Sequence, residues 1–173
     1  MIKFKLEVAE DYVLEIKTKR NYVDLLEKLD EIIDEDNEEI ENIAILDEQN
    51  NYLIYSMEFG MGTVQDFKDI VNFFEEENVT FDDFIKTLVK INDYEQYLGT
   101  SNDIFIYDSI DHYLDKNLPH NPFEYMCDLS HFYKAEVGNK PLTDYYNLEA
   151  IKTNLKTAKN AIILSDNRYL VFH

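Results

Sequence analysis

The sequence predicts a mixed α+β fold, because helices and strands follow one another without the regular alternation of a doubly wound sheet. Three features predict it. Residues 2–8 alternate apolar and polar side chains, as a half-buried strand does. The apolar side chains of residues 22–33 recur at steps of three and four, which predicts an amphipathic helix. Two apolar runs, 161–164 and 169–172, flank a turn-rich segment and predict a terminal hairpin.

Further strands are expected between these elements. Residues 12–18 are expected to pair with the first strand as a hairpin. Strands at 43–46 and 52–57 flank the turn-rich segment 47–51. The apolar run within 103–108 predicts another strand.

Helices are predicted where apolar periodicity follows a capping residue. After the first helix they are expected at 64–76, 81–91, 110–117, 123–133 and 144–152. Short polar side chains can accept hydrogen bonds from the first free N–H groups of a helix. The predicted N-caps are therefore Asn21, Thr63, Thr80 and Ser109.

The chain is expected to divide into about three small subdomains. No internal repeat or long linker interrupts it, and the two clearest breaks fall near residues 61 and 100. The prediction is an N-terminal α+β subdomain at 1–61, a central, mainly helical one at 62–100 and a C-terminal α+β one at 101–173. Gly60 to Thr63 would be a flexible turn, since it lacks the third Gly and the Lys of a phosphate-binding loop.

Charge is the most unusual property of the sequence. The chain has 36 acidic and 16 basic residues and a formal net charge of −20. Residues 21–60 hold 13 of the acids and a single base, Lys28. Such a surface repels nucleic acid and anionic membranes and attracts basic partners. With apolar residues at 45% of the chain, an acidic disordered tail is excluded and a folded acidic surface is expected.

The predicted binding residues are carboxylates spaced along this acidic segment. Steps of three and four residues advance about 4.5–6 Å along a helix, while duplex DNA has one phosphate per strand every ~3.4 Å. The pattern is compatible with imitation of a phosphate row, although a solvated helix face gives the same pattern. The candidates in and after the first helix are Asp24, Glu27, Asp30, Glu31, Asp34, Glu35, Asp36, Glu38, Glu39 and Glu41. Those later in the chain are Asp69, Glu76, Asp83, Asp108 and Asp111.

Catalytic, metal and cofactor sites find no support in the sequence. Asp34, Asp36 and Glu38 alternate as in a calcium loop, but the required Gly and final Glu are missing. Cys127 and His131 would share a helix face, and a thiol–imidazole pair is the minimum for nucleophilic catalysis. Packing between helices explains that pair better. We therefore expect a protein that is not an enzyme and needs no metal or cofactor.

The expected location is the cytoplasm. Cys127 is the only cysteine, so no intramolecular disulfide can form, and a reducing compartment is the natural environment. The N-terminal residues lack the apolar run of a secretory signal. No segment approaches the ~18 apolar residues of a membrane span.

The order of these features resembles the ArdA antirestriction family, small acidic proteins of mobile elements. The segment from Asp144 to Leu155 with the hairpin after it is similar to the family's Tyr-x-Asp-Tyr-x-Ala-x-Gly-Arg-Asp-Leu segment and closing hairpin. Tyr145, Ala150 and Leu155 match that pattern, whereas its Gly-Arg-Asp core is replaced by Lys152, Thr153 and Asn154. The strand at 103–108, the acidic helix after Asn21 and the strand at Ile43 also fit the family's order of elements.

The resemblance implies a function and an assembly. It implies an elongated chain and a homodimer joined through one end. It also implies a curved acidic surface that imitates bent DNA and occupies the DNA-binding groove of a type I restriction–modification enzyme in a bacterial host. The dimer contact is expected in 101–173, because the net negative charge of this segment is smaller than that of the other acidic segments. Two alternatives remain: inhibition of another defence nuclease, as by an anti-CRISPR protein, and an acidic adaptor that binds through Phe73, Phe74, Phe81 and Phe84.

The charge density predicts how salt affects stability. Carboxylates crowded within 21–60 repel one another, and physiological salt shortens the range of that repulsion to ~8 Å. We expect the melting temperature to rise between low and moderate salt, as measured by thermal circular dichroism. A flat or falling response would show that these charges are already paired or well separated.

Overall fold

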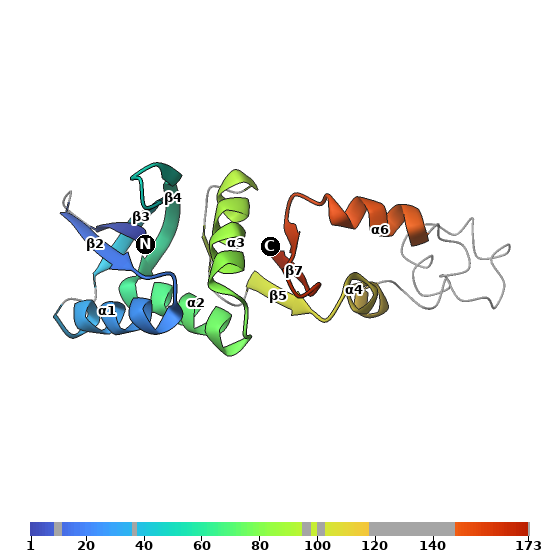
Figure 1. Cartoon of the computed structure of the whole chain (residues 1–173), viewed down its shortest axis with the longest axis horizontal. Coiled ribbons are helices and arrows are strands. Elements are labelled where there is room, and N and C mark those ends of the chain that lie inside the picture. The colour runs from blue at the N-terminus through green and yellow to red at the C-terminus, as the bar shows by residue number, and fades with distance from the viewer. Residues whose placement is uncertain (9–11, 36–37, 95–97, 100–102, 118–147, 173) are drawn as a thin grey trace, which may run out of the picture. The chain divides into compact units, whose positions relative to one another are not determined.

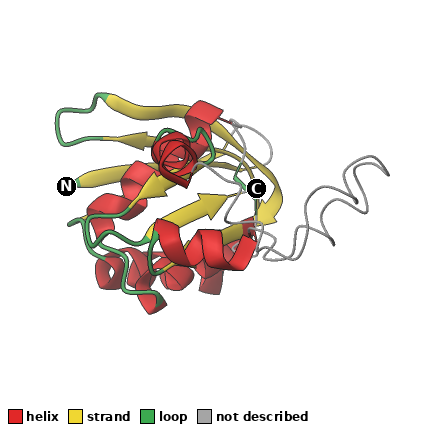
Figure 2. Ribbon diagram, turned by 90° about the vertical axis from the view of Figure 1, so that its right-hand side faces the viewer, coloured by secondary structure: helices red, strands yellow, loops and turns green. Residues whose placement is uncertain are grey.

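The computed structural model describes residues 1–8, 12–35, 38–94, 98–99, 103–117 and 148–172, and for Asp34, Glu35 and Met61 only the backbone. Helices and strands are mixed along the chain, and the strands form two sheets, which confirms the predicted α+β class (Figures 1 and 2). The chain divides into two compact units. Unit 1 comprises Met1–Phe105 with Val171–His173, and unit 2 comprises Ile106–Leu170.

Unit 1 is built on a four-stranded antiparallel sheet of order β2-β1-β3-β4. The hairpin β1 (Ile2–Val8) and β2 (Tyr12–Thr18) has the predicted bounds and pairs Phe4 with Ile16. The next two strands are longer than predicted, namely β3 (Glu39–Leu46) and β4 (Tyr52–Thr63). Every second residue of β1 is buried, as the alternation in the sequence predicts.

The helices α1 (Tyr22–Glu35) and α2 (Val64–Glu76) lie along one side of this sheet (Figure 1). Asn21 caps α1, because its side-chain oxygen accepts a hydrogen bond from the Asp24 N–H at 2.7 Å. Thr63 and Asp66 form a complete capping box at the start of α2. The helix ends at Glu76 with Glu77 as its C-cap, and the next residue, Asn78, has a φ of 52°, in the left-handed region that Asn tolerates. The predicted caps of both helices are confirmed.

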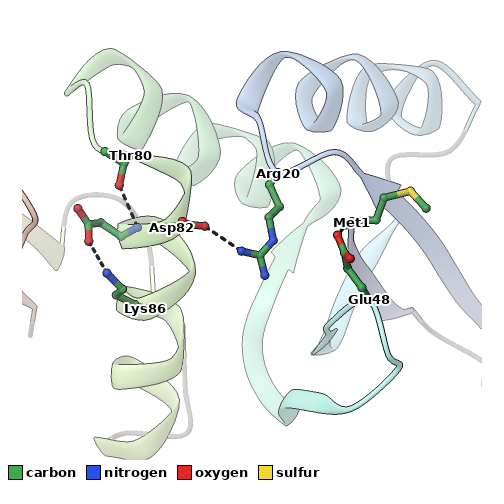
Figure 3. A network of polar contacts seen from close by, with 7 residues as sticks. Met1, Arg20, Glu48, Thr80, Asp82 and Lys86 are labelled. Carbon is green, nitrogen blue, oxygen red and sulfur yellow. Dashed lines mark hydrogen bonds and ion pairs between the residues drawn. The ribbon is translucent and has the colours of Figure 1, made fainter.

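A third helix, α3 (Phe81–Tyr94), follows α2 after a short turn. Its predicted cap, Thr80, accepts a hydrogen bond from the Asp83 N–H at 3.2 Å. The side chain of Arg20 ion-pairs with Asp82 at 3.1 Å and so ties the start of α3 to the connection between β2 and α1 (Figure 3). The hydroxyl of Tyr22 donates to the Thr80 carbonyl at 3.4 Å beside the same turn.

Aromatic side chains fill the core of unit 1. The ring of Phe67 on α2 lies 5.9 Å from that of Phe4 on β1 and 6.1 Å from that of Phe59 on β4. Phe74 on α2 lies 5.0 Å from Phe84 on α3. All five rings are at most 3% exposed. Each buried apolar side chain of this size stabilises the fold by about 1.5–3 kcal/mol, which offsets the repulsion between surface carboxylates.

The segment from Gly60 to Thr63 is not the flexible turn that the sequence predicts. It forms the end of β4, where Gly62 pairs with Ile40 and Thr63 with Glu39. Between Ile40 and Asn42, one residue of β3 faces three residues of β4, so the longer strand bulges. The ring of Phe59 packs directly on Gly62, and a Cβ there would lie 2.3 Å from a ring carbon. The glycine serves this close approach rather than flexibility.

The second sheet has the order β5-β7-β6, with β5 (Ile104–Tyr107), β6 (Ala161–Ile163) and β7 (Tyr169–Phe172). The last two strands are neighbours joined by a tight turn, which confirms the predicted terminal hairpin. Within unit 2, α4 (Ile110–Asn117) is capped by Ser109 as predicted. The hydroxyl of Tyr169 donates to the Leu155 carbonyl at 2.9 Å, which holds α6 (Leu148–Lys156) beside the hairpin.

Some predictions are not addressed by this description. The helix expected at 123–133, with Cys127 and His131, lies outside the described residues, as does 144–147 of the next helix. The division into three subdomains stays a prediction, although its border at residue 61 falls inside β4. None of the helices in the described segments is long and apolar enough to cross a membrane.

The contact between Phe59 and Gly62 generates a mutational prediction. Gly62→Ala forces the Phe59 ring or the strand to move, and overpacking of this kind costs about 1–3 kcal/mol. We expect a matching loss in the free energy of unfolding, measured by urea denaturation. Gly60→Ala is the control, because Gly60 is exposed in the same strand. An equal effect of both substitutions would contradict the proposed role of the Phe59 contact.

Candidate functional site

Three elements bring acidic residues together at one end of unit 1. The N–H of Val64, at the start of α2, donates to the Glu38 carbonyl at 3.1 Å, just before β3. Lys68, one turn into α2, ion-pairs with Asp30 in the second half of α1. The end of α1, the start of β3 and the start of α2 therefore lie side by side. Asp30 and Glu38, which belong to different elements, both lie beside the first turns of α2.

We call this group of carboxylates the acidic rim. Its members lie on α1, on α2 and on the paired strands β3 and β4, except Glu38, which directly precedes β3. All are exposed apart from Glu38, which is partly exposed. Within the described part of the chain, none of them has a cation at ion-pair distance. The carboxylate of Asp69 accepts a hydrogen bond from the neutral Gln65 at 2.7 Å. The acidic rim comprises Glu27, Glu31, Glu38, Glu39, Glu41, Glu58 and Asp69.

A shallow depression lies within the acidic rim. It has a volume of about 460 Å³ and is lined by residues of β3 and β4. Its three acidic side chains are Glu39, Glu41 and Glu58. The bulge of β4 opposite Glu41 separates the strands locally. An open hollow with three carboxylates suits a guanidinium or ammonium group, which needs several acceptors and no apolar enclosure.

Asp24, a predicted binding residue, has a structural role instead. Its carboxylate accepts hydrogen bonds from the Lys19 N–H at 2.8 Å and from the Lys28 ammonium at 3.0 Å. These contacts hold its pKa near 2, with the Lys19 N–H as the largest cause. Lys28 also donates to the Lys17 carbonyl. Asp24 thus fastens the start of α1 to the end of β2 and does not face a partner freely.

Asp83 is the clearest correction to the predicted set. The residue is only 2% exposed, so its carboxylate cannot form part of a surface track. It lies in the first turn of α3, where it ion-pairs with Lys86 at 3.1 Å. An acidic side chain in the first turn of a helix stabilises the positive end of the helix dipole. The sequence pattern does not distinguish an acidic residue with this role from one with a surface carboxylate.

The other predicted carboxylates of unit 1 have mixed positions. Asp30 is exposed at the margin of the acidic rim, but Lys68 neutralises it. Glu76 is exposed in the last turn of α2, about two turns after Asp69. The side chains of Asp34 and Glu35 and the whole of Asp36 lie outside the description.

In unit 2, the predicted carboxylates Asp108 and Asp111 both lie next to possible cations. Asp108 is 3.1 Å from the ring Nδ1 of His112. Asp111 is 2.6 Å from the Lys152 ammonium, whose pKa is raised chiefly by this hydrogen bond. These two carboxylates are exposed but less available to a partner than those of the acidic rim.

Sequence reasoning missed one rim residue, Glu58. It lies opposite Asn42 in the sheet. Regular pairing of the two strands on either side of the turn at 47–51 would place a different residue opposite Asn42. The irregularities of β4 shift its register, and short-range patterns do not reveal such shifts. The only signal was the proximity of Glu58 to the predicted strand at 52–57.

The phenylalanines of the adaptor hypothesis are not an exposed patch. Phe74 and Phe84 are fully buried, and Phe81 is 7% exposed. Their rings pack on one another and on Tyr22, and Phe73 packs edge-on against Phe74. They hold α1, α2 and α3 together, so this form of the adaptor hypothesis is wrong.

No group of three or more possible metal ligands occurs among the residues that the structure describes. Comparison with known proteins gave no matching family model, no matching curated protein and no matching solved structure. The chemical arrangement of the acidic rim is therefore the basis for a functional proposal. It offers exposed, unneutralised carboxylates on a rigid support.

Asp24 generates a prediction for the pH dependence of stability. Its pKa is about 2 in the folded protein and about 3.9 in an unfolded chain, so the unfolded state binds more protons between these values. Its contribution is complete above pH ~5 and is lost as the pH falls toward 2. We expect Asp24→Asn to lower the melting temperature at pH 7 and to match the wild type near pH 2.

The control for this experiment is Glu27→Gln, an exposed carboxylate on the same helix without a cation partner in the described chain. It removes the same charge but no structural hydrogen bonds. Its melting temperature should equal or exceed that of the wild type at pH 7. A loss equal to that of Asp24→Asn would mean that charge alone, rather than the contacts of Asp24, sets the stability.

Proposed function

We propose that this protein is a non-enzymatic inhibitor whose acidic rim imitates DNA phosphates and occupies the basic groove of a DNA-binding protein. The observation that supports it most is that Glu39, Glu41 and Glu58, exposed carboxylates without a cation at ion-pair distance in the described chain, line one depression of the sheet. A solvated helix face would need carboxylates from one element only. Here two paired strands contribute to the depression, and α1 and α2 carry further carboxylates of the same kind.

The proposed mechanism is competition for the groove. Lys and Arg side chains of a DNA-binding groove are placed to neutralise phosphates, and phosphate contacts do not depend on base sequence. Carboxylates at similar spacing satisfy the same side chains. The net charge of −20 adds long-range attraction, which raises the rate of association. Sequence-independent inhibition follows from this mechanism.

Rigidity supports the mimicry. The rim residues of β3 and β4 lie in a paired sheet, and those of α1 and α2 lie on helices that pack over aromatic core residues. The ion pair of Lys68 with Asp30 links the two helices beside the rim. A pre-ordered surface loses less conformational entropy on binding than flexible acidic tails do.

The first target to test is a type I restriction–modification enzyme, because the sequence resembles the ArdA antirestriction family. Such an inhibitor would act in the cytoplasm of a bacterial host and, by the same resemblance, as a homodimer. Another defence nuclease, such as a CRISPR effector, has the same kind of basic groove. Competition assays against both enzyme classes separate the two targets, since each measures displacement of that enzyme's own DNA.

The acidic rim can be tested with a charge-removing variant that spares Asp24. Replacing Glu27, Glu31, Glu39 and Glu41 with Gln removes four carboxylates that have no cation at ion-pair distance among the described residues. An exposed ion pair contributes about 0.2–1 kcal/mol, so the loss of four pairs should weaken inhibition between about fourfold and nearly a thousandfold. The inhibition constant should also depend less steeply on salt than that of the wild type. Competition for DNA binding at several salt concentrations measures both.

A matched control removes four carboxylates that already lie beside cations. Glu15, Glu48, Asp82 and Glu149 contact Lys5, the N-terminal ammonium, Arg20 and Lys152. Their replacement by Gln or Asn changes the net charge equally but leaves the acidic rim intact. If both variants weakened inhibition equally, the effect would depend on the total charge of the protein and not on the acidic rim. Unchanged inhibition by the rim variant would show that the rim is merely solvated.

A further inference from the structure

One face of the four-stranded sheet is turned away from α1 and α2. Ile2, Phe4, Leu6 and Val8 point to the helices and are buried, so the intervening residues of β1 point the other way. Residues paired across strands share a face. Lys3, Lys5 and Glu7 therefore form one surface with their partners in β2 and β3 and with the neighbouring residues of β4. We call this surface the open face.

Charge on the open face is graded along the strands. The row at one end contains Lys17, Lys3, Leu46 and Tyr52. The middle row contains Lys5 and Glu15, which ion-pair at 3.5 Å. The row at the other end contains Val13, Glu7, Asn42 and Glu58. One end is thus positive, the middle is neutral and the other end is negative.

The open face has charges of both signs. Its three lysines equal Glu7, Glu15 and Glu58 in number, and Glu39 and Glu41 line the depression with Glu58 at the negative end. In a chain of net charge −20, this surface repels another acidic molecule less than the acidic rim does. It has exposed apolar side chains as well, since Tyr55 is 76%, Tyr52 49% and Val13 40% exposed. The rings of Tyr52 and Tyr55 lie 5.1 Å apart on the same strand.

We propose that the open face binds the open face of a second copy of this chain. The two copies are related by a two-fold axis that runs across the strands through the middle row. The positive row of each copy then lies over the negative row of the other copy. Lys3 of the first copy faces Glu7 of the second copy, and by symmetry Glu7 of the first copy faces Lys3 of the second. The neutral middle rows meet at the axis, with Tyr55 near its own counterpart.

The charge gradient selects this arrangement. A two-fold axis parallel to the strands would place the positive row of one copy over the positive row of the second copy, and juxtaposed like charges are unfavourable. The axis across the strands places opposite charges together instead. Facing sheets pack about 10 Å apart with a moderate angle between their strands, a distance that long Lys and Glu side chains can bridge.

The size of the open face predicts a weak association. Four strands about 4.8 Å apart and five residues of about 3.4 Å each cover on the order of 300 Å². A stable interface buries about 800 Å² per partner, so this one belongs to the transient class. It is separate from the C-terminal dimer that the ArdA resemblance implies. In a chain already joined there, it would add a further, concentration-dependent step.

Charge reversal tests the proposal on the full chain. Sedimentation equilibrium up to about millimolar concentration should show an association step that Lys3→Glu or Glu7→Lys weakens roughly tenfold or more. The double variant Lys3→Glu/Glu7→Lys should regain it, because the reversed charges again face each other. An equimolar mixture of the two single variants should also regain it as a mixed pair. Lys159→Glu and Glu31→Lys, outside the open face, serve as controls.

Chemical cross-linking provides a second test that does not depend on these variants. In a chain with Cys127→Ser, Tyr55→Cys should be joined to its counterpart by a bis-maleimide of about 10 Å, whereas Glu27→Cys on α1 should not. The proposal is overturned if association is absent or insensitive to Lys3 and Glu7. It is also overturned if neither the double variant nor the mixture restores association, or if both cysteines cross-link equally.

Discussion

Unit 1 depends on the packing of Phe67 between the sheet and α2. Its ring contacts Phe4 and Phe59, and Phe59 in turn packs on Gly62. This chain of contacts joins β1, β4 and α2 and sets where β4 bends and α2 begins. Because Thr63 follows Gly62 directly and caps α2, the core contact also fixes the start of that helix. The burial of large aromatic side chains is the term that holds together a chain whose surface charges repel one another.

The acidic rim is a consequence of this packing. The start of α2 lies beside the start of β3, and Lys68 links α2 to Asp30 of α1. Glu39, Glu41 and Glu58 line one depression, while Lys28, the base within the acidic segment 21–60, is occupied by Asp24 and the Lys17 carbonyl. Lys28 and Lys68, the cations nearest to the rim in sequence, are used in local contacts, and the rim has no counter-charge at ion-pair distance in the described chain. Unpaired like charges lower the stability of the fold. A protein keeps such a destabilising arrangement where the charge serves binding.

Two surfaces of unit 1 thus differ in electrostatic character. The acidic rim has one sign of charge, as the proposed basic partner requires, whereas the open face has both signs, as the proposed pairing with a second copy requires. Both meet at Glu58, which lines the depression and ends the negative row of the open face. Binding of a target at the rim and association of two copies through the open face would therefore be coupled through this residue.

The sequence by itself determined the α+β class, the first hairpin, the terminal hairpin and the N-caps of α1 to α4, because these depend on local periodicity and on polar side chains next to a helix start. It also located the excess charge in residues 21–60. Only the tertiary structure decided which carboxylates serve the surface. Asp83 is buried at a helix start and Asp24 is tied to Lys19 and Lys28, while Glu58 joins the rim through an irregular register that no local pattern shows. Helix periodicity gives the direction of a side chain relative to its own helix, but burial and ion pairing depend on which other element packs against it.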